Sequence, residues 1–143
     1  MKSIQHRSDC PISYTLDILG DKWMLLILRD MIFAEKESYK EFMQSGEGIA
    51  TNVLADRLSI LETEKFITKK VSPANKKSFV YRLTDKGITL IPLIMEITLW
   101  GSAFNPKGGN KELLKKLKKD KEGVVAEFTA KMKERTFKSV ARV

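Results

Sequence analysis

At 143 residues the chain has the length of one ordinary domain, and a hydrophobic fraction of 43% beside a charged fraction of 31% excludes intrinsic disorder. The net charge of +8 favours a polyanionic partner. No apolar run approaches the roughly 20 residues that cross a bilayer, no apolar export signal opens the chain, and one cysteine cannot form an internal disulfide framework. We therefore expect a cytoplasmic protein with no membrane partner.

Two helices are expected near the N-terminus, over about 11–19 and 22–33. Pro11 suits the first position of a helix, where its missing N–H is no loss, and apolar residues follow it at helical spacing. Asp21 can cap the second helix. This second helix is apolar around its whole circumference over 23–28, so we expect it at the centre of the fold.

A helix-turn-helix pattern follows. Residues 39–43 predict a short helix, 44–49 predict a glycine-containing turn, and 51–64 predict a longer helix. On a helical wheel, leucines line the inner side of the longer helix. The opposite side carries the small or polar residues Asn52, Ala55, Asp56, Ser59 and Thr63. A short helix, a tight turn and a second helix with such an outer face are typical of a helix-turn-helix.

The periodicity then changes to that of a β-hairpin. Residues 66–71 and 78–83 are rich in β-branched and aromatic side chains, and a turn over 72–77 separates them. The stretch from Lys65 to Arg82 contains six basic residues and no acidic one. The hairpin is therefore expected to present a basic surface beside the helix-turn-helix.

A long apolar helix is expected next, capped by Thr84 or Asp85, ending near Trp100, and bent if Pro92 lies inside it. It has more apolar surface than one small domain can cover, and a symmetric partner is the commonest way to cover such a surface. We therefore expect a homodimer, with the first helix packed against this one. The expected dimer contacts are Leu90, Ile91, Ile94, Ile97 and Trp100.

A basic extension is expected over 105–143, after a linker at 105–110. Two helices, about 111–119 and 124–137, are predicted around Gly123. Residues 107–143 carry 12 Lys and Arg against 5 Asp and Glu, whereas the preceding residues carry 14 against 13. We expect the extension to add phosphate contacts or to pack in the dimer, and binding of anionic lipid by its basic helices is an alternative.

Several short motifs resemble those of HxlR-type transcription regulators, relatives of the MarR group. They are Cys10-Pro11-Ile12, Gly20-Asp21-Lys22-Trp23, the apolar run up to Arg29, Gly48-Ile49, Leu54, Arg57-Leu58, Leu61-Glu62, Tyr81 to Gly87 and Trp100-Gly101. The resemblance covers about 9–104. It implies a mainly α fold with a small β-hairpin wing (α+β), in which a winged helix-turn-helix has flanking dimerisation helices. In place of the Ser-Pro pair with which the family often opens its recognition helix, this chain has Ala50-Thr51.

Such a fold places its second helix in the major groove of double-stranded DNA, with N-terminal residues at base edges. The candidates for base readout are Thr51, Asn52, Ala55, Asp56 and Ser59. An asparagine can bind adenine in bidentate fashion, and an aspartate can accept from cytosine. Flexible lysines reach phosphates without fixed geometry. The candidates for phosphate or wing contacts are Lys69, Lys70, Lys76, Lys77 and Arg82.

Each of these assignments has a plainer alternative. The polar helix face can be ordinary solvated surface, and the lysines at the hairpin tip can be a solvated turn. Arg57 flanks the leucine stripe, so we expect a structural ion pair there instead of a base contact. A non-catalytic protein-interaction module built on the same amphipathic helices remains the alternative function.

Enzymatic function is not expected. His6 is the sole histidine and Cys10 the sole cysteine, so neither a zinc cluster of ordinary spacing nor a Ser-His-Asp or Cys-His site is plausible. No phosphate-binding loop motif is present. We therefore assign no catalytic residue, metal or cofactor, and no polar constellation identifies a small-molecule effector.

The resemblance also permits a redox role for Cys10, since some HxlR-type regulators use a cysteine at this place. A thiol directly before Pro11 lies at a helix N-terminus, which favours the thiolate; Arg7 adds to this effect and Asp9 opposes it. The alternative is a cysteine that caps the helix or packs inside the protein.

Overall fold

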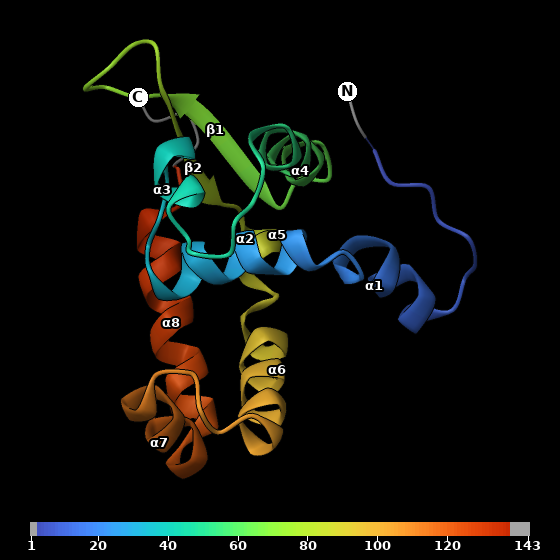
Figure 1. Ribbon diagram of the computed structural model, residues 1–143, viewed down its shortest axis with the longest axis vertical. Coiled ribbons are helices and arrows are strands. Elements are labelled where there is room, and N and C mark those ends of the chain that lie inside the picture. The colour runs from blue at the N-terminus through green and yellow to red at the C-terminus, as the bar shows by residue number, and fades with distance from the viewer. Residues whose placement is uncertain (1–2, 138–143) are drawn as a thin grey trace.

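The computed structural model describes residues 3–137 and is mainly helical, with one two-stranded antiparallel hairpin (Figure 1). The elements are α1 (Pro11–Leu19), α2 (Lys22–Phe33), α3 (Tyr39–Met43), α4 (Thr51–Thr63), β1 (Ile67–Val71), β2 (Phe79–Leu83), α5 (Asp85–Ile88), α6 (Ile91–Phe104), α7 (Lys111–Lys119) and α8 (Lys121–Arg135). In Figure 1, α3, α4 and the hairpin occupy one end, α6 and α7 the other, and α2 crosses between them. The predicted mainly α fold with a β-hairpin is confirmed.

Local capping explains where several helices begin. The Asp21 carboxylate accepts a hydrogen bond from the Met24 N–H at 3.3 Å, which satisfies one of the unpaired donors at the start of α2. Ser38 and Glu41 form a reciprocal capping box at α3. Pro11 lies in the first turn of α1, as predicted.

The helix α2 is the centre of the hydrophobic core. Its buried apolar side chains are Met24, Ile27, Leu28, Met31 and Ile32. They belong to one cluster with Leu54, Leu58 and Leu61, the inner stripe of α4. Burying one such side chain contributes about 1.5–3 kcal/mol, so this contact fixes α4 with its opposite face outward.

The hairpin is anchored at its base and free at its tip. Antiparallel pairing runs from Ile67 opposite Leu83 at the base to Val71 opposite Phe79 near the turn. Ile67 and Leu83 are buried, whereas Val71 and turn residues 73–77 are exposed. The tip therefore projects into solvent at the same end of the molecule as α4 (Figure 1).

The segment from Asp85 to Trp100 is two helices, which corrects the expectation of one. Thr89 and Leu90 separate α5 from α6, and Pro92 lies in the first turn of α6. A proline in the first turn removes no intrahelical hydrogen bond, so Pro92 starts a helix here and does not bend one.

One segment of the described chain, Asp85–Phe104, is long and apolar enough by composition to cross a membrane, although no uninterrupted apolar run reaches that length. Its best window has a mean hydropathy of 1.5 and is 28% buried. Core helices of soluble proteins pass the same test. Glu96 forms an ion pair with Lys121 of α8, so this part of α6 also carries a paired charge.

The basic extension packs against the rest of the chain. Leu117, Val124 and Met132 are buried in the same cluster as the α2 side chains. The break between α7 and α8 falls at Asp120, which accepts from the Gly123 N–H at 3.0 Å and so caps α8; the expected break at Gly123 is corrected. The extension thus forms part of the protomer's own core, a role that the sequence did not indicate.

Candidate nucleic-acid interface

The outer face of α4 is open to solvent. Thr51, Asn52 and Ala55 are exposed, and Asp56 and Ser59 are half-buried, so all five readout candidates lie on the accessible side of the helix. The helix begins at Thr51, with Ala50 as an N-cap that makes no side-chain hydrogen bond. The Tyr39 hydroxyl donates to the Thr51 carbonyl at 2.7 Å and so ties α3 to the start of α4.

Arg57 forms the structural ion pair that its wheel position predicts. Its Nε donates to the Asp21 carboxylate at 2.8 Å, and its Nη1 donates to Asp56 at 2.7 Å. The first bond joins α4 to the cap of α2. The second places Asp56 in an ion pair within the protomer, so a cytosine would compete with Arg57 for this carboxylate.

The ion pair also shifts the ionisation of its members. The hydrogen bond from Arg57 lowers the pKa of Asp21 below its ordinary value of 3.8, although partial burial opposes this. A carboxyl group whose pKa is lower in the folded than in the unfolded state stabilises the fold at pH values above the unfolded-state pKa. That stabilisation is lost as the pH falls through the folded-state pKa.

The Asp21→Asn variant is expected to unfold at a lower urea concentration than the wild type near neutral pH, by about 1 kcal/mol or less because the pair is partly exposed. Because asparagine caps helices as well as aspartate does, the loss in free energy of unfolding measures the ion pair and not the helix cap. Urea titrations are expected to show this difference shrinking below about pH 4, where the unfolded-state carboxyl becomes protonated. A difference independent of pH would contradict the assignment, and the exposed Asp9→Asn is the control.

The hairpin lysines differ in their surroundings. Lys76 and Lys77 are exposed at the tip. On β1, Lys69 lies 4.0 Å from Glu62 and stacks over the Phe79 ring, and Lys70 lies over the Phe137 ring. The tip lysines are therefore the members of this set best placed to reach another molecule.

Arg82, a candidate for phosphate contacts, forms an internal ion pair in the protomer. Its Nε donates to Glu37 at 2.9 Å, and its Nη1 donates to the Arg135 carbonyl at 2.7 Å. Arg135 itself binds Glu37 at 2.8 Å. The end of α8 and the loop before α3 thus hold the base of the wing together.

Two of the five expected dimer contacts lie inside the protomer. Ile91 and Ile94 are 0% and 5% exposed, so they pack in the protomer's own core and cannot cover a partner's surface. Leu90 is half-buried. Ile97 and Trp100 are 44% and 70% exposed, and Phe104, which sequence reasoning missed, is 74% exposed. The spacing of apolar residues predicted the apolar helix, but it did not show which side of that helix faces the core.

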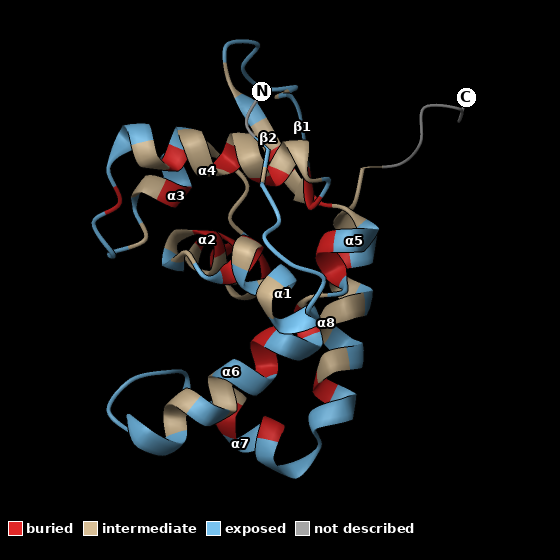
Figure 2. Cartoon of the chain, turned by 90° about the vertical axis from the view of Figure 1, so that its right-hand side faces the viewer, coloured by how far each residue is buried: buried red, intermediate tan, exposed pale blue. Residues whose placement is uncertain are grey.

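The first helix presents a second apolar surface. Ile12, Tyr14 and Leu16 are exposed large side chains on α1, which projects from the body of the molecule (Figure 1). Figure 2 shows exposed residues along both α1 and α6. Exposed apolar faces of this kind mark interaction sites.

Cys10 is exposed and occupies the N-cap position of α1, where its side chain makes no capping hydrogen bond. Arg7 lies 3.5 Å from Asp17, so that carboxylate and not the thiol is its ion-pair partner. Within the protomer the thiol therefore neither caps α1 through a side-chain hydrogen bond nor packs in the core. Among residues 3–137, no group of three His, Cys, Asp or Glu side chains is arranged to hold a metal ion.

The model of the HxlR-like helix-turn-helix family matches residues 18–108. The chain belongs to this family. An HTH-type transcriptional regulator of Halalkalibacterium halodurans, BH0655, is 32% identical to this HxlR-like protein over 101 residues, which are 71% of the chain and 87% of the relative. The matched range ends before α7, so α7 and α8 lie outside it.

Two solved structures share this fold. The redox regulator HypR in its oxidised form superposes with a TM-score of 0.59 at 28% identity, over 66% of this chain and 96% of HypR. The reduced form of the transcriptional regulator YodB from Bacillus subtilis gives a TM-score of 0.55 at 27% identity, over 71% and 100%. The HxlR-like protein is thus a winged helix-turn-helix member of a transcription-regulator family.

Proposed function

We propose that the protein acts in the cytoplasm as a homodimer that binds an inverted-repeat DNA operator and so regulates transcription. The observation that carries this proposal is that the solvent-exposed outer face of α4 and a basic wing tip lie at the same end of the molecule (Figure 1). The recognition helix of such a fold reads base edges, and a basic wing contacts phosphates.

The apolar faces of α6 and α1 support the homodimer. A two-fold dimer buries the same patch of both subunits, which is the commonest way to cover a large apolar surface. The two recognition helices would then lie about 34–36 Å apart, one turn of DNA, or at a multiple of that spacing. An operator with two-fold symmetry follows from this arrangement.

Footprinting of genomic fragments with the purified protein tests the proposal and is expected to yield a protected inverted repeat. The Asn52→Ala variant is expected to lose discrimination at one base pair in each half-site by roughly tenfold, because a bidentate asparagine–adenine contact is worth about 1–3 kcal/mol. Asn105→Ala, the same truncation at the exposed C-cap residue of α6, is the control, since α6 lies at the opposite end of the molecule from α4 (Figure 1). An unchanged base preference in Asn52→Ala would remove Asn52 from the readout. No protection even at low salt would favour the protein-interaction or membrane-surface alternative.

A thiol response through Cys10 is the second part of the proposal. The exposed thiol and the likeness to HypR, a redox regulator, support it. Oxidation by diamide would join the Cys10 sulfurs of two protomers, while two protons and two electrons pass to the diazene. Such a bond would move α1 and the separation of the two recognition helices.

Diamide is therefore expected to change operator affinity in the wild type and to leave Cys10→Ser unaffected. Gel-shift titrations with and without diamide, followed by non-reducing electrophoresis, measure both the affinity and the cross-link. Cys10→Ser in the absence of oxidant serves as the control for folding and DNA binding. An identical response of the two proteins, or no response from either, would leave Cys10 without a sensing role.

A further inference from the structure

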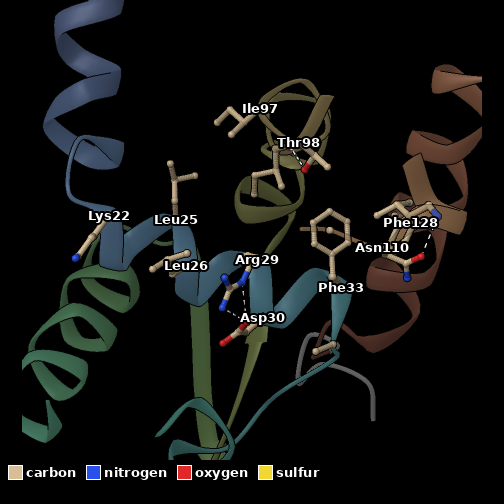
Figure 3. Close-up of a pocket in the computed structure, with 14 residues that line it drawn as sticks. Lys22, Leu25, Leu26, Arg29, Asp30, Phe33, Ile97, Thr98, Asn110 and Phe128 are labelled. Atoms are coloured by element: carbon tan, nitrogen blue, oxygen red, sulfur yellow. Dashed lines mark hydrogen bonds and ion pairs between the residues drawn. The ribbon is translucent and has the colours of Figure 1, made fainter. Parts of the chain in front are cut away.

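The last turns of α8 lie at the base of the wing. In Figure 1, α8 runs from the end of the molecule that holds α7 to the hairpin, and it contacts α5, α6 and β2. Phe128 anchors α8 on α2, since its ring meets that of Phe33 edge to face, with centroids 5.5 Å apart, beside the cavity drawn in Figure 3. One turn later, the buried Met132 belongs to the core cluster. The range that the family model matches ends before α8, so the extension supplies this contact with the wing.

Arg135, the last residue of α8, joins segments that are far apart in the sequence. Its Nη2 donates to the Glu37 carboxylate at 2.8 Å, and its Nη1 donates to the Glu35 carboxylate at 3.2 Å. Arg82 of β2 donates to the same Glu37 oxygen at 2.9 Å and to the Arg135 carbonyl at 2.7 Å. These four residues form one network, the wing-base cluster, in which α8, the wing and the loop before α3 meet.

The loop before α3 is held by its main chain as well. The Tyr81 N–H of β2 donates to the Glu37 carbonyl at 2.7 Å, and the Glu37 N–H donates to the Glu41 carboxylate of α3 at 2.9 Å. Glu35 ends α2 in the left-handed region, with φ of 53°, where glycine is favoured. Arg135 and Lys131 of α8 both bind its carboxylate, so α8 helps to hold the loop between the wing and the helix-turn-helix.

The charge of Arg135 is used inside the protomer. Its side chain is 27% exposed, and both of its terminal nitrogens bind carboxylates of the same chain. Phe137 covers the neighbouring cations, since the Lys70 Nζ and the Arg82 guanidinium each lie 5.0 Å from its ring centroid. An effect of Arg135 on DNA affinity is therefore expected to act through the wing, and not through a phosphate contact of its own.

We propose that Arg135 is a positioning residue for DNA binding, which fixes the wing relative to the helix-turn-helix so that the tip lysines reach phosphates. A two-stranded hairpin alone is marginally stable in water, so contacts at its base decide how firmly it is held. A wing already held in its bound orientation avoids the entropy cost of becoming ordered on DNA. The role in DNA binding rests on the proposed function, whereas the hold on the wing is tested without DNA.

Amide hydrogen exchange measures the hold on the wing in the full chain. In Arg135→Ala, the Tyr81 amide is expected to exchange roughly tenfold faster than in the wild type, and the Leu58 amide of α4 is expected to be much less affected, because local opening exposes only the wing. Lys133→Ala removes the same charge from an exposed position of α8 and is expected to leave both exchange rates unchanged. An unchanged Tyr81 rate, or equal acceleration of both amides, would overturn the proposal.

A double-mutant cycle on the footprinted operator tests the role in DNA binding. Arg135→Ala is expected to weaken operator affinity roughly tenfold in the wild type and by less than about twofold when Lys76 and Lys77 are both alanine, because a wing without its tip lysines gains little from being held. Arg135→Lys keeps the charge but lacks the planar fork that binds two carboxylates, so its affinity is expected to lie between those of Arg135→Ala and the wild type. Thermal unfolding verifies that each variant is folded, and Lys133→Ala is again the control.

Equal losses of affinity in the two backgrounds would show that Arg135 acts independently of the wing tip and would overturn the proposal. Wild-type operator affinity of Arg135→Ala, with faster exchange at Tyr81, would overturn the role in DNA binding and leave only a structural contact. If the wild type binds no duplex even at low salt, the proposed function fails and the role in DNA binding fails with it. The exchange experiment would then still decide whether Arg135 holds the wing.

Discussion

Replacing Trp100 by aspartate is expected to convert the protein from dimer to monomer and to lower operator affinity roughly hundredfold or more. Trp100 is 70% exposed on α6, and its ring lies 5.0 Å from that of Phe104. Buried tryptophans at the centre of an interface are typical hot spots, worth at least about 2 kcal/mol when truncated. A carboxylate in the same place adds the cost of removing a charge from water.

The loss of DNA affinity follows from the loss of the dimer. A monomer reaches one half-site only, so the second recognition helix no longer binds as part of the same molecule and its effective concentration is lost. The protomer itself is expected to remain folded, because Trp100 faces solvent there and makes no part of the core cluster. Thermal unfolding and circular dichroism verify this point.

Light scattering at micromolar concentration measures the dimer, and a gel shift on the footprinted operator measures the affinity. Ala130→Asp adds the same charge at an exposed position of α8 and is the control. A Trp100→Asp protein that remains dimeric would show that the interface lies on another surface. The α1 face formed by Ile12 and Leu16 would then be the next candidate.

Signals close together in the sequence predicted most of the fold. Pro11, the Asp21 cap and the leucine spacing of α4 act within a few residues, so the helices begin and end close to their predicted positions. The β-branched strands likewise predicted the hairpin. The helical spacing of the leucines was enough to predict the exposed face of α4, because a buried leucine stripe leaves the opposite side of the helix facing solvent.

Contacts between distant residues account for what the sequence did not show. Arg82 was assigned to phosphate contacts because its neighbours are basic, yet its partners Glu37 and Arg135 are 45 and 53 residues away. The packing of α7 and α8 against α6 has the same origin, since their net charge suggested an external role. Ile91 and Ile94 show the limit of composition, because an all-apolar helix does not reveal which side meets the core.

The internal ion pairs around Arg82 also separate two parts of the wing. Its base carries cations that carboxylates of the same chain neutralise, whereas the tip extends beyond them. Counterion release on DNA depends on cations that reach phosphates, not on the total number in the segment. The tip lysines are thus expected to carry most of the wing's contribution to DNA affinity.

Replacing Lys76 and Lys77 together by alanine is therefore expected to weaken binding to all duplexes alike and to flatten the salt dependence. Each cation that no longer reaches a phosphate lowers the slope of log K against log salt by about 0.9, so removing both lysines from both protomers lowers it by about 3.6. Specificity is expected to stay the same, because phosphates carry no sequence information. Fluorescence anisotropy with operator and random duplexes over a salt series measures both quantities.

The matched control removes the same charge from the other end of the molecule. Lys118 and Lys119 are exposed on α7, far from the wing in Figure 1, and their double alanine variant has the same net charge as the wing variant. If net charge alone attracted DNA, the two variants would weaken binding equally. If the tip lysines contact phosphates, only the wing variant changes the slope. A wing variant with the wild-type slope would contradict the placement of the hairpin on the DNA backbone. A reduced slope in the α7 variant would show that the basic extension also contacts DNA phosphates.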